Sequence, residues 1–82
     1  MTDMAGTNIA LRITNSLDHE VTLGVEPWGD QYKMASGATF LVEAQGPDQD
    51  LLEIEYGPNS ITVYGWPGST VALTETKISA EG

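Results

Sequence analysis

Two turns of this chain combine an indole with residues that hold it rigidly, and binding is the chemistry they suit. Each turn places a tryptophan beside a proline and a glycine, which fix the backbone and permit a sharp reversal. A ring held in this way loses little entropy on binding, so two such rings can form a platform for a sugar face, a proline-rich peptide or a cation. The turns are residues 26–30 around Trp28 and residues 64–69 around Trp66, and Glu26 and Asp30 flank the first ring.

The same tryptophans have a structural alternative. A tryptophan at a strand end commonly plugs the open end of a small β-sandwich, with its N–H bonded to a loop carbonyl. Trp28 and Trp66 both stand at the ends of expected strands. The sequence therefore leaves the binding role and the plugging role open for each ring.

The charge balance restricts the partners that a binding surface would meet. Twelve acidic residues accompany three basic ones, and the net charge is -9. Binding to nucleic acid or to an anionic membrane requires clustered lysine and arginine, so we expect neither. The balance favours solubility and attraction to a basic protein partner.

Catalysis is not indicated. Glu43 and Glu53, if directly opposed, would be a carboxylate pair of the kind that glycosidases use, but a chain of 82 residues has little room for the deep cleft such a pair needs. His19 lies in a polar turn, where a surface position is expected, and no G-x-S-x-G pattern is present. We predict that the protein is not an enzyme and has no catalytic residue.

Metal and cofactor sites are not indicated either. The chain has no cysteine and one histidine, which excludes thiolate zinc sites and multi-histidine sites. Asp48 and Asp50, with Glu53 nearby, are a weak calcium pattern that lacks the full EF-hand loop. We predict no metal and no cofactor.

Apolar residues alternate with polar ones through most of the chain, a repeat that places one set of side chains on each face of a β-strand. Ile9, Leu11 and Ile13 are one such set. The pattern predicts an all-β domain over residues 1–82, a small antiparallel β-sandwich or partly open barrel of about seven short strands. We expect frayed ends at 1–6 and 78–82, no substantial helix and a cytoplasmic location. The expected strands lie near 7–14, 20–26, 30–35, 38–45, 51–56, 60–66 and 69–76.

The inward set follows from the phase of each strand. The inward set has seventeen residues, a core size that suits a two-layer domain of this length. The expected core is Ile9, Leu11, Ile13, Val21, Leu23, Val25, Tyr32, Met34, Phe40, Val42, Leu52, Ile54, Tyr56, Ile61, Val63, Val71 and Leu73.

Two assumed hairpins define an outer surface. If residues 46–50 close one hairpin and residues 57–60 the next, Glu43 lies opposite Glu53, and Glu53 lies opposite Tyr64. Carboxylates mixed with large apolar groups are unusual on a merely solvated face, and an exposed apolar patch with Tyr and Trp indicates an interaction site. The predicted three-strand surface carries Leu41, Glu43, Leu51, Glu53, Glu55, Tyr64 and Trp66.

These observations favour a non-enzymatic binding protein. Glu43, Glu53 and Glu55 would steer a basic protein partner, and Tyr64, Trp66 and Trp28 would anchor it. A homodimer through the same sheet is one version of this hypothesis. Two alternatives remain: a carbohydrate or small-ligand module that uses the tryptophan turns, with Glu26 and Asp30, and an acidic inhibitor, either an immunity protein or a nucleic-acid mimic.

Overall fold

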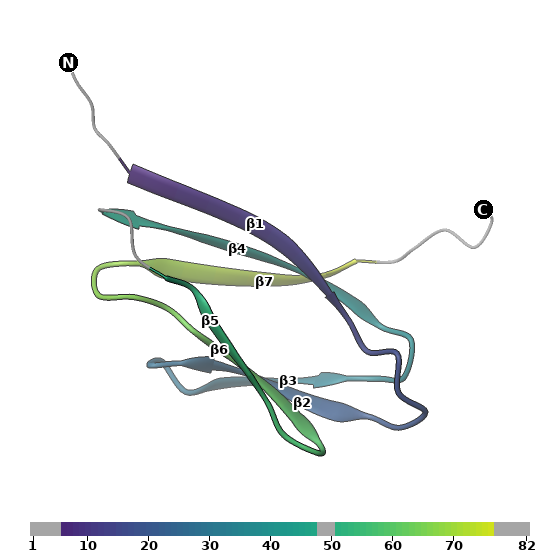
Figure 1. Ribbon diagram of the computed structural model, residues 1–82. Helices are drawn as coiled ribbons and strands as arrows, with labels where there is room; N and C mark the ends of the chain where they lie inside the picture. Colours follow the sequence, from purple (N-terminus) through teal and green to yellow (C-terminus); the bar gives the residue numbers. More distant parts are fainter. Residues whose placement is uncertain (1–5, 48–50, 77–82) are drawn as a thin grey trace.

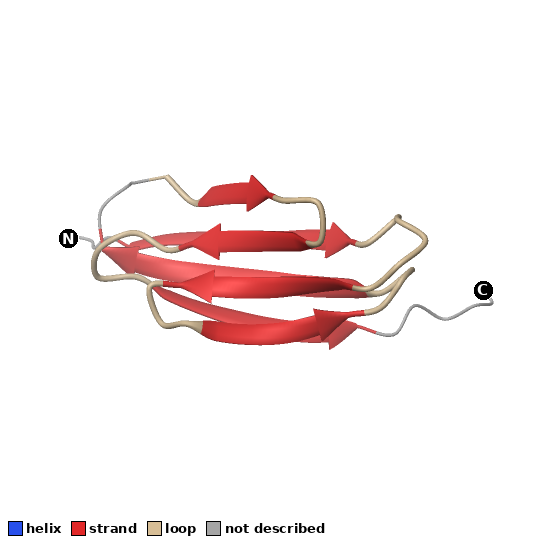
Figure 2. Ribbon diagram, turned by 90° about the horizontal axis from the view of Figure 1, so that it is seen from below, coloured by secondary structure: helices blue, strands red, loops and turns tan. Residues whose placement is uncertain are grey.

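The computed structural model describes residues 6–47 and 51–76, and these form two packed β-sheets (Figure 1). The strands of both sheets run along the long axis of the molecule, with the turns gathered at its two ends (Figure 2). The all-β sandwich is confirmed, and the sheets do not close into a barrel. The strands are β1 (Gly6–Thr14), β2 (Val21–Glu26), β3 (Asp30–Met34), β4 (Thr39–Pro47), β5 (Glu53–Tyr56), β6 (Ser60–Tyr64) and β7 (Thr70–Thr76).

The strands divide into a three-stranded sheet with the order β1-β4-β7 and a four-stranded sheet with the order β3-β2-β6-β5. All seven expected strands are present, with small differences at their ends. Gly6, expected in a frayed end, begins β1 opposite Pro47. None of the described segments forms a helix with the length and apolar character that a bilayer crossing needs.

The assumed hairpin between β4 and β5 is wrong. β4 pairs with β1 and β7, so Val42 lies opposite Leu11 and Leu73 instead of Ile54. The chain changes sheets after β4, and a loop long enough for a wide hairpin also spans the distance of about 10 Å between packed sheets. The second assumed hairpin is confirmed, because Tyr56 pairs with Ile61 and Ile54 with Val63.

The pairing of β2 with β6 is parallel, whereas we expected antiparallel hairpins throughout. It sets Glu26 beside Tyr64 and Gly24 beside Thr62. Parallel neighbours need a long connection, and here the strands β3, β4 and β5 provide it. This pairing brings the ends of the two tryptophan turns together.

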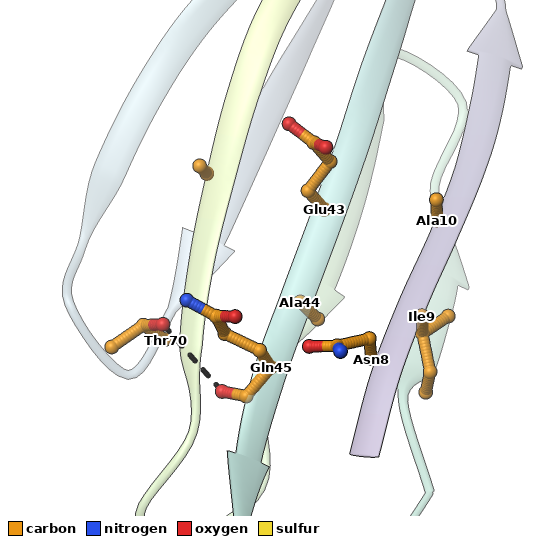
Figure 3. A pocket seen from close by; sticks show the side chains of 8 residues that line it. Asn8, Ile9, Ala10, Glu43, Ala44, Gln45 and Thr70 are labelled. Atoms are coloured by element: carbon orange, nitrogen blue, oxygen red, sulfur yellow. Dashed lines mark hydrogen bonds between the residues drawn. The ribbon is translucent and has the colours of Figure 1, made fainter. Parts of the chain in front are cut away.

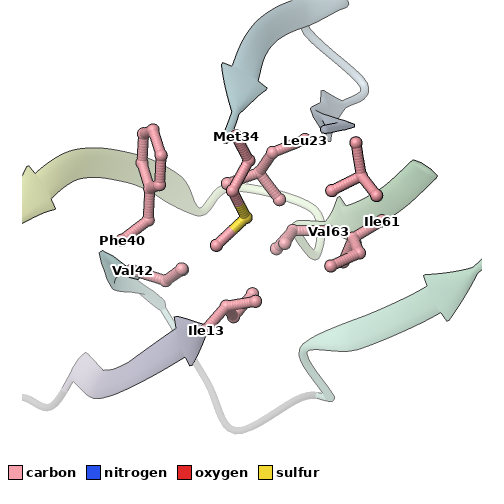
Figure 4. Close-up of a cluster of buried hydrophobic side chains, with 8 residues drawn as sticks. Ile13, Leu23, Met34, Phe40, Val42, Ile61 and Val63 are labelled. Carbon is pink, nitrogen blue, oxygen red and sulfur yellow. The ribbon is translucent and has the colours of Figure 1, made fainter. Parts of the chain in front are cut away.

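The core lies between the sheets and follows the expected phase (Figure 4). The predicted burial of Tyr32 and Tyr56 is wrong, because these side chains keep 37% and 74% of their surface exposed. Both belong to border strands of the four-stranded sheet, and Tyr32 lies near Phe40 of the facing sheet, with the ring centroids 6.0 Å apart. Ala44 and Trp66 are buried although neither was expected in the core. The central cluster is Ile13, Val21, Leu23, Met34, Phe40, Val42, Ile61 and Val63.

Asn15 ties the two sheets together at the end where β1 leads to β2. Its side chain is almost fully buried, and its Nδ2 group donates to the carbonyl oxygens of His19, Met34 and Ala35 at 2.9, 3.0 and 3.1 Å. Its Oδ1 atom accepts a hydrogen bond from the Leu17 N–H at 3.0 Å. The end of β1 in one sheet is thereby joined to the end of β3 in the other.

Candidate binding site

Tyr64 lies between two carboxylates on the outer face of the four-stranded sheet. The register pairs it with Glu26 on β2 and with Glu53 on β5. The pairing of Glu53 with Tyr64 confirms the sequence prediction. The three side chains form one row across the sheet, because residues paired in register point to the same face.

The Tyr64 hydroxyl donates a hydrogen bond of 2.7 Å to Oε1 of Glu55, which stands two residues along β5 from Glu53. This hydrogen bond is the main cause that raises the pKa of Tyr64, and the charges of Glu55, Glu26 and Glu53 act in the same direction. The phenol therefore stays protonated and neutral among three carboxylates. The surface that it shares with them is strongly acidic.

Trp28 stands at the end of β2, after a cis peptide bond between Glu26 and Pro27, with 45% of its surface exposed. Its ring lies against the backbone of Gly65: a Cβ atom at position 65 would be 2.9 Å from the Cη2 atom of Trp28. The Gly65 N–H donates to the carbonyl oxygen of Glu26 at 2.9 Å, which joins the two turns. Only glycine leaves room for the indole here, so the ring is seated and yet half-exposed.

Trp66 takes the plugging role. It is 5% exposed, and its Nε1–H donates to the carbonyl oxygen of Pro47 at 3.0 Å. Ser69 closes the turn, because its hydroxyl oxygen accepts the Trp66 N–H at 2.9 Å and its hydroxyl donates to the Trp66 carbonyl at 2.6 Å. The turn after β6 crosses from one sheet to the other, and its indole is folded against the end of β4. The prediction of Trp66 as an exposed anchor is therefore wrong.

A hollow of about 730 Å³ opens where the two turns meet. Both turns line it together with Thr62 and Tyr64 on the outer face of β6. We call Glu26, Trp28, Glu53, Glu55 and Tyr64 the acidic–aromatic site. It offers the exposed indole and three carboxylates on one side of the molecule.

Glu43 does not join this site. It lies on the outer face of the other sheet, paired with Ala10 on β1 and Ala72 on β7 (Figure 3). The predicted three-strand surface is wrong for this reason, since Leu41 and Glu43 point away from the sheet that carries Glu53. The error follows from the assumed hairpin between β4 and β5.

Asp30 is also separated from Glu26. It pairs with Val25, whose side chain is buried, so Asp30 shares the inward-facing phase of β3 while Glu26 points outward. The predicted pair of carboxylates on either side of Trp28 is reduced to Glu26.

The described residues offer no metal centre. In residues 6–47 and 51–76, no three carboxylate, histidine or cysteine side chains are grouped so that they could hold a metal ion. Asp48 and Asp50, the weak calcium pattern, lie outside the described residues. His19 is exposed at the opposite end of β2, where it contacts Asp18 and the carbonyl oxygen of Pro58.

Sequence reasoning missed Gly65 as the seat of Trp28 and the hydrogen bond between Tyr64 and Glu55. The glycine before Trp66 was a signal, but its partner lies on another strand and becomes visible only through the parallel pairing of β2 and β6. No protein family, curated protein or solved structure matches this chain.

Proposed function

We propose that this protein is a non-enzymatic binding protein that holds a basic segment of a protein partner at the acidic–aromatic site. The observation that carries the proposal is the half-exposed Trp28 ring, seated on Gly65 beside the row of Tyr64 and its carboxylates. A seated ring is an anchor that costs little entropy to use. The sequence expectation places this encounter in the cytoplasm.

The charge around the ring selects a cation as the ligand. Three carboxylates of this site surround one neutral phenol, and the face of an indole attracts an ammonium or guanidinium group. On the outer face of the four-stranded sheet, the described basic side chain is Lys33, which is 84% exposed and stands near Glu20. Among residues 6–47 and 51–76, no basic side chain is therefore placed to neutralise the site.

Self-association through this face is not favoured. A two-fold contact would set the same patch against itself, and three carboxylates on each copy would then repel three on the other. A basic partner satisfies the same groups. We therefore infer that the partner at this site is a different protein and not a second copy of the chain.

Carbohydrate binding is the second candidate, and the hollow beside Trp28 is the observation that favours it. An exposed indole, the Glu26 carboxylate and the Thr62 hydroxyl border one open space. Sugar recognition combines such a ring with hydrogen-bond acceptors and donors. Under this candidate function, an uncharged sugar is expected to bind at the hollow.

Tryptophan fluorescence separates the two candidates. Arginine-rich and lysine-rich peptides and a panel of neutral oligosaccharides are titrated into the protein, and a Trp28→Phe variant assigns the signal to the exposed ring. We expect saturable changes with the cationic peptides only. Saturation by a neutral sugar would favour the second candidate, and an unchanged signal with every ligand would contradict both.

A matched pair of charge reversals tests the position of the site. Glu53→Lys is expected to weaken peptide binding about 3–10-fold, the effect of reversing one charge at the rim of an interface. Glu43→Lys makes the same change on the other sheet and is expected to leave binding unchanged. Equal effects of the two variants would mean that net charge, and not this site, attracts the peptide.

A further inference from the structure

The four border strands of the two sheets differ in how well they are protected against pairing with another chain. β5 has four residues and carries Glu53 and Glu55, and β3 has five residues and carries Asp30 and Lys33. Short border strands with charged side chains discourage strand addition. Both borders of the four-stranded sheet are protected in this way.

The three-stranded sheet has one protected border and one that is not. β7 carries Glu75 in the phase of Val71 and Leu73, which face the core, and an inward-pointing charge on a border strand opposes pairing. β1 is nine residues long, has no proline and carries Arg12 as its one charged residue, on the outer face. A long, weakly charged border strand of this kind is a site for strand addition.

We propose that a second copy of this chain pairs with β1 antiparallel along residues 8–14, about a two-fold axis at Leu11, and so joins the two three-stranded sheets into one. The proposal concerns the sheet that does not carry the acidic–aromatic site, so it stands or falls separately from the proposed function. The pairing is isologous and closes as a dimer.

On the inner face, this register sets apolar residues against apolar residues. Leu11 lies opposite the partner's Leu11, and Ile9 lies opposite the partner's Ile13. Ile9 and Leu11 are only half-buried in the single chain, although their phase directs them toward the core. Pairing covers this apolar surface, which is the favourable term in the association.

On the outer face, the same register aligns opposite charges. The partner's Arg12 lies opposite Ala10, and Ala10 is paired with Glu43 on β4 (Figure 3). The partner's Arg12 and Glu43 are then two strand spacings apart, about 10 Å between Cα atoms, with a small side chain between them. Long side chains bridge such a gap over an alanine. The symmetry of the dimer makes the contact twice.

Neither charge forms an ion pair within the part of the chain that the structure describes. Among the described residues, the ion pairs join His19 with Asp18 and Lys33 with Glu20, so Arg12 and Glu43 are left without an ionic partner. Arg12 is one of three basic residues in a chain of net charge -9, and it stands on the border strand that the other features favour. This charge complementarity identifies a second copy as the occupant.

Sedimentation velocity over a range of protein concentrations tests the dimer. We expect a concentration-dependent dimer, and Arg12→Glu is expected to raise its dissociation constant at least ~10-fold, since it makes two attractive contacts repulsive. Lys33→Glu removes the same charge from the other sheet and is expected to have no such effect. The double variant Arg12→Glu with Glu43→Arg restores opposite charges and is expected to recover the dimer.

Single cysteines test the register, because the chain contains none of its own. A cysteine in place of Leu11 faces its own copy across the axis and is expected to form a disulfide-linked dimer under mild oxidation. A cysteine in place of Ile9 faces the partner's Ile13 and is expected to remain a thiol. A monomer at every concentration, or equal cross-linking by both variants, would overturn the proposal.

Discussion

The indole of Trp28 packs against the backbone of Gly65, although the two residues belong to different turns. A Cβ atom at position 65 would approach Cη2 of the ring to 2.9 Å and the Ser69 hydroxyl to 2.7 Å. One glycine thus holds the exposed ring in place and gives space to the hydroxyl that closes the turn around Trp66. The acidic–aromatic site and the plug of the sandwich meet at this point.

Gly65→Ala is therefore expected to disturb both tryptophans. Overpacking against a ring and a buried hydroxyl costs about 1–3 kcal/mol of unfolding free energy, and the Trp28 emission should shift as the ring is displaced. Urea denaturation and fluorescence spectra measure the two effects. Gly24→Ala is the matched control, because a Cβ there meets its nearest atom at 3.8 Å. Equal stability of the two variants would contradict the close contact between the Trp28 ring and Gly65.

The two tryptophans are expected to respond differently to the same substitution. Trp66→Phe leaves the carbonyl oxygen of Pro47 without its Nε1–H donor, at a cost of about 1–3 kcal/mol. Trp28→Phe keeps an aromatic ring on Gly65 and should change the unfolding free energy by less than about 0.5 kcal/mol. Chemical denaturation of both variants checks the order, and the reverse order would exchange the roles of the two rings.

The difference between the tryptophans shows where sequence reasoning stops. The alternation of side chains predicted every strand, because a period of two depends only on neighbouring residues. The turn at 57–60 also predicted the register of β5 and β6, since a short turn leaves the two strands little choice. The pairing of Glu53 with Tyr64, two of the five residues of the acidic–aromatic site, follows from that local signal.

The remaining features depend on distant parts of the chain. A five-residue loop after β4 serves a hairpin or a change of sheet equally well, so Glu43 was assigned to the wrong sheet. The parallel pairing of β2 and β6 joins Glu26 to Tyr64 across a long stretch of sequence, and no local pattern marks it. The turn that crosses between the sheets determines which tryptophan is buried at the end of the sandwich.

Asn15 is expected to be the most sensitive polar residue of the fold. Asn15→Ala leaves three carbonyl oxygens without their shared donor, and we expect a loss of about 2–4 kcal/mol of unfolding free energy. Asn15→Asp keeps the shape but directs an oxygen at those carbonyls, so it should be at least as damaging. Ser16→Ala, on an exposed neighbour, is the control and should have little effect. A loss of the same small size in all three variants would contradict the role of the Asn15 amide.

His19 gives the protein a stability term that depends on pH. The hydrogen bond to Asp18, followed by that to the carbonyl oxygen of Pro58, raises the pKa of His19 above its ordinary value of 6.5. Both partners are acceptors, so the protonated ring, which donates from both nitrogens, satisfies both at once. The folded state therefore holds this proton more tightly than the unfolded state.

The sign of the effect follows from this preference. Below pH 6.5 the contribution of His19 to stability is fully present, and it is lost as the pH rises through the folded-state pKa. We expect the His19 ring resonances to titrate with a midpoint above 6.5, and the unfolding free energy to fall over the same interval. Asp18→Asn should move the midpoint back toward the ordinary value, and His19→Gln should remove this part of the pH dependence. A wild-type midpoint at or below the ordinary value would contradict the assignment, because the two acceptors would then not favour the charged ring.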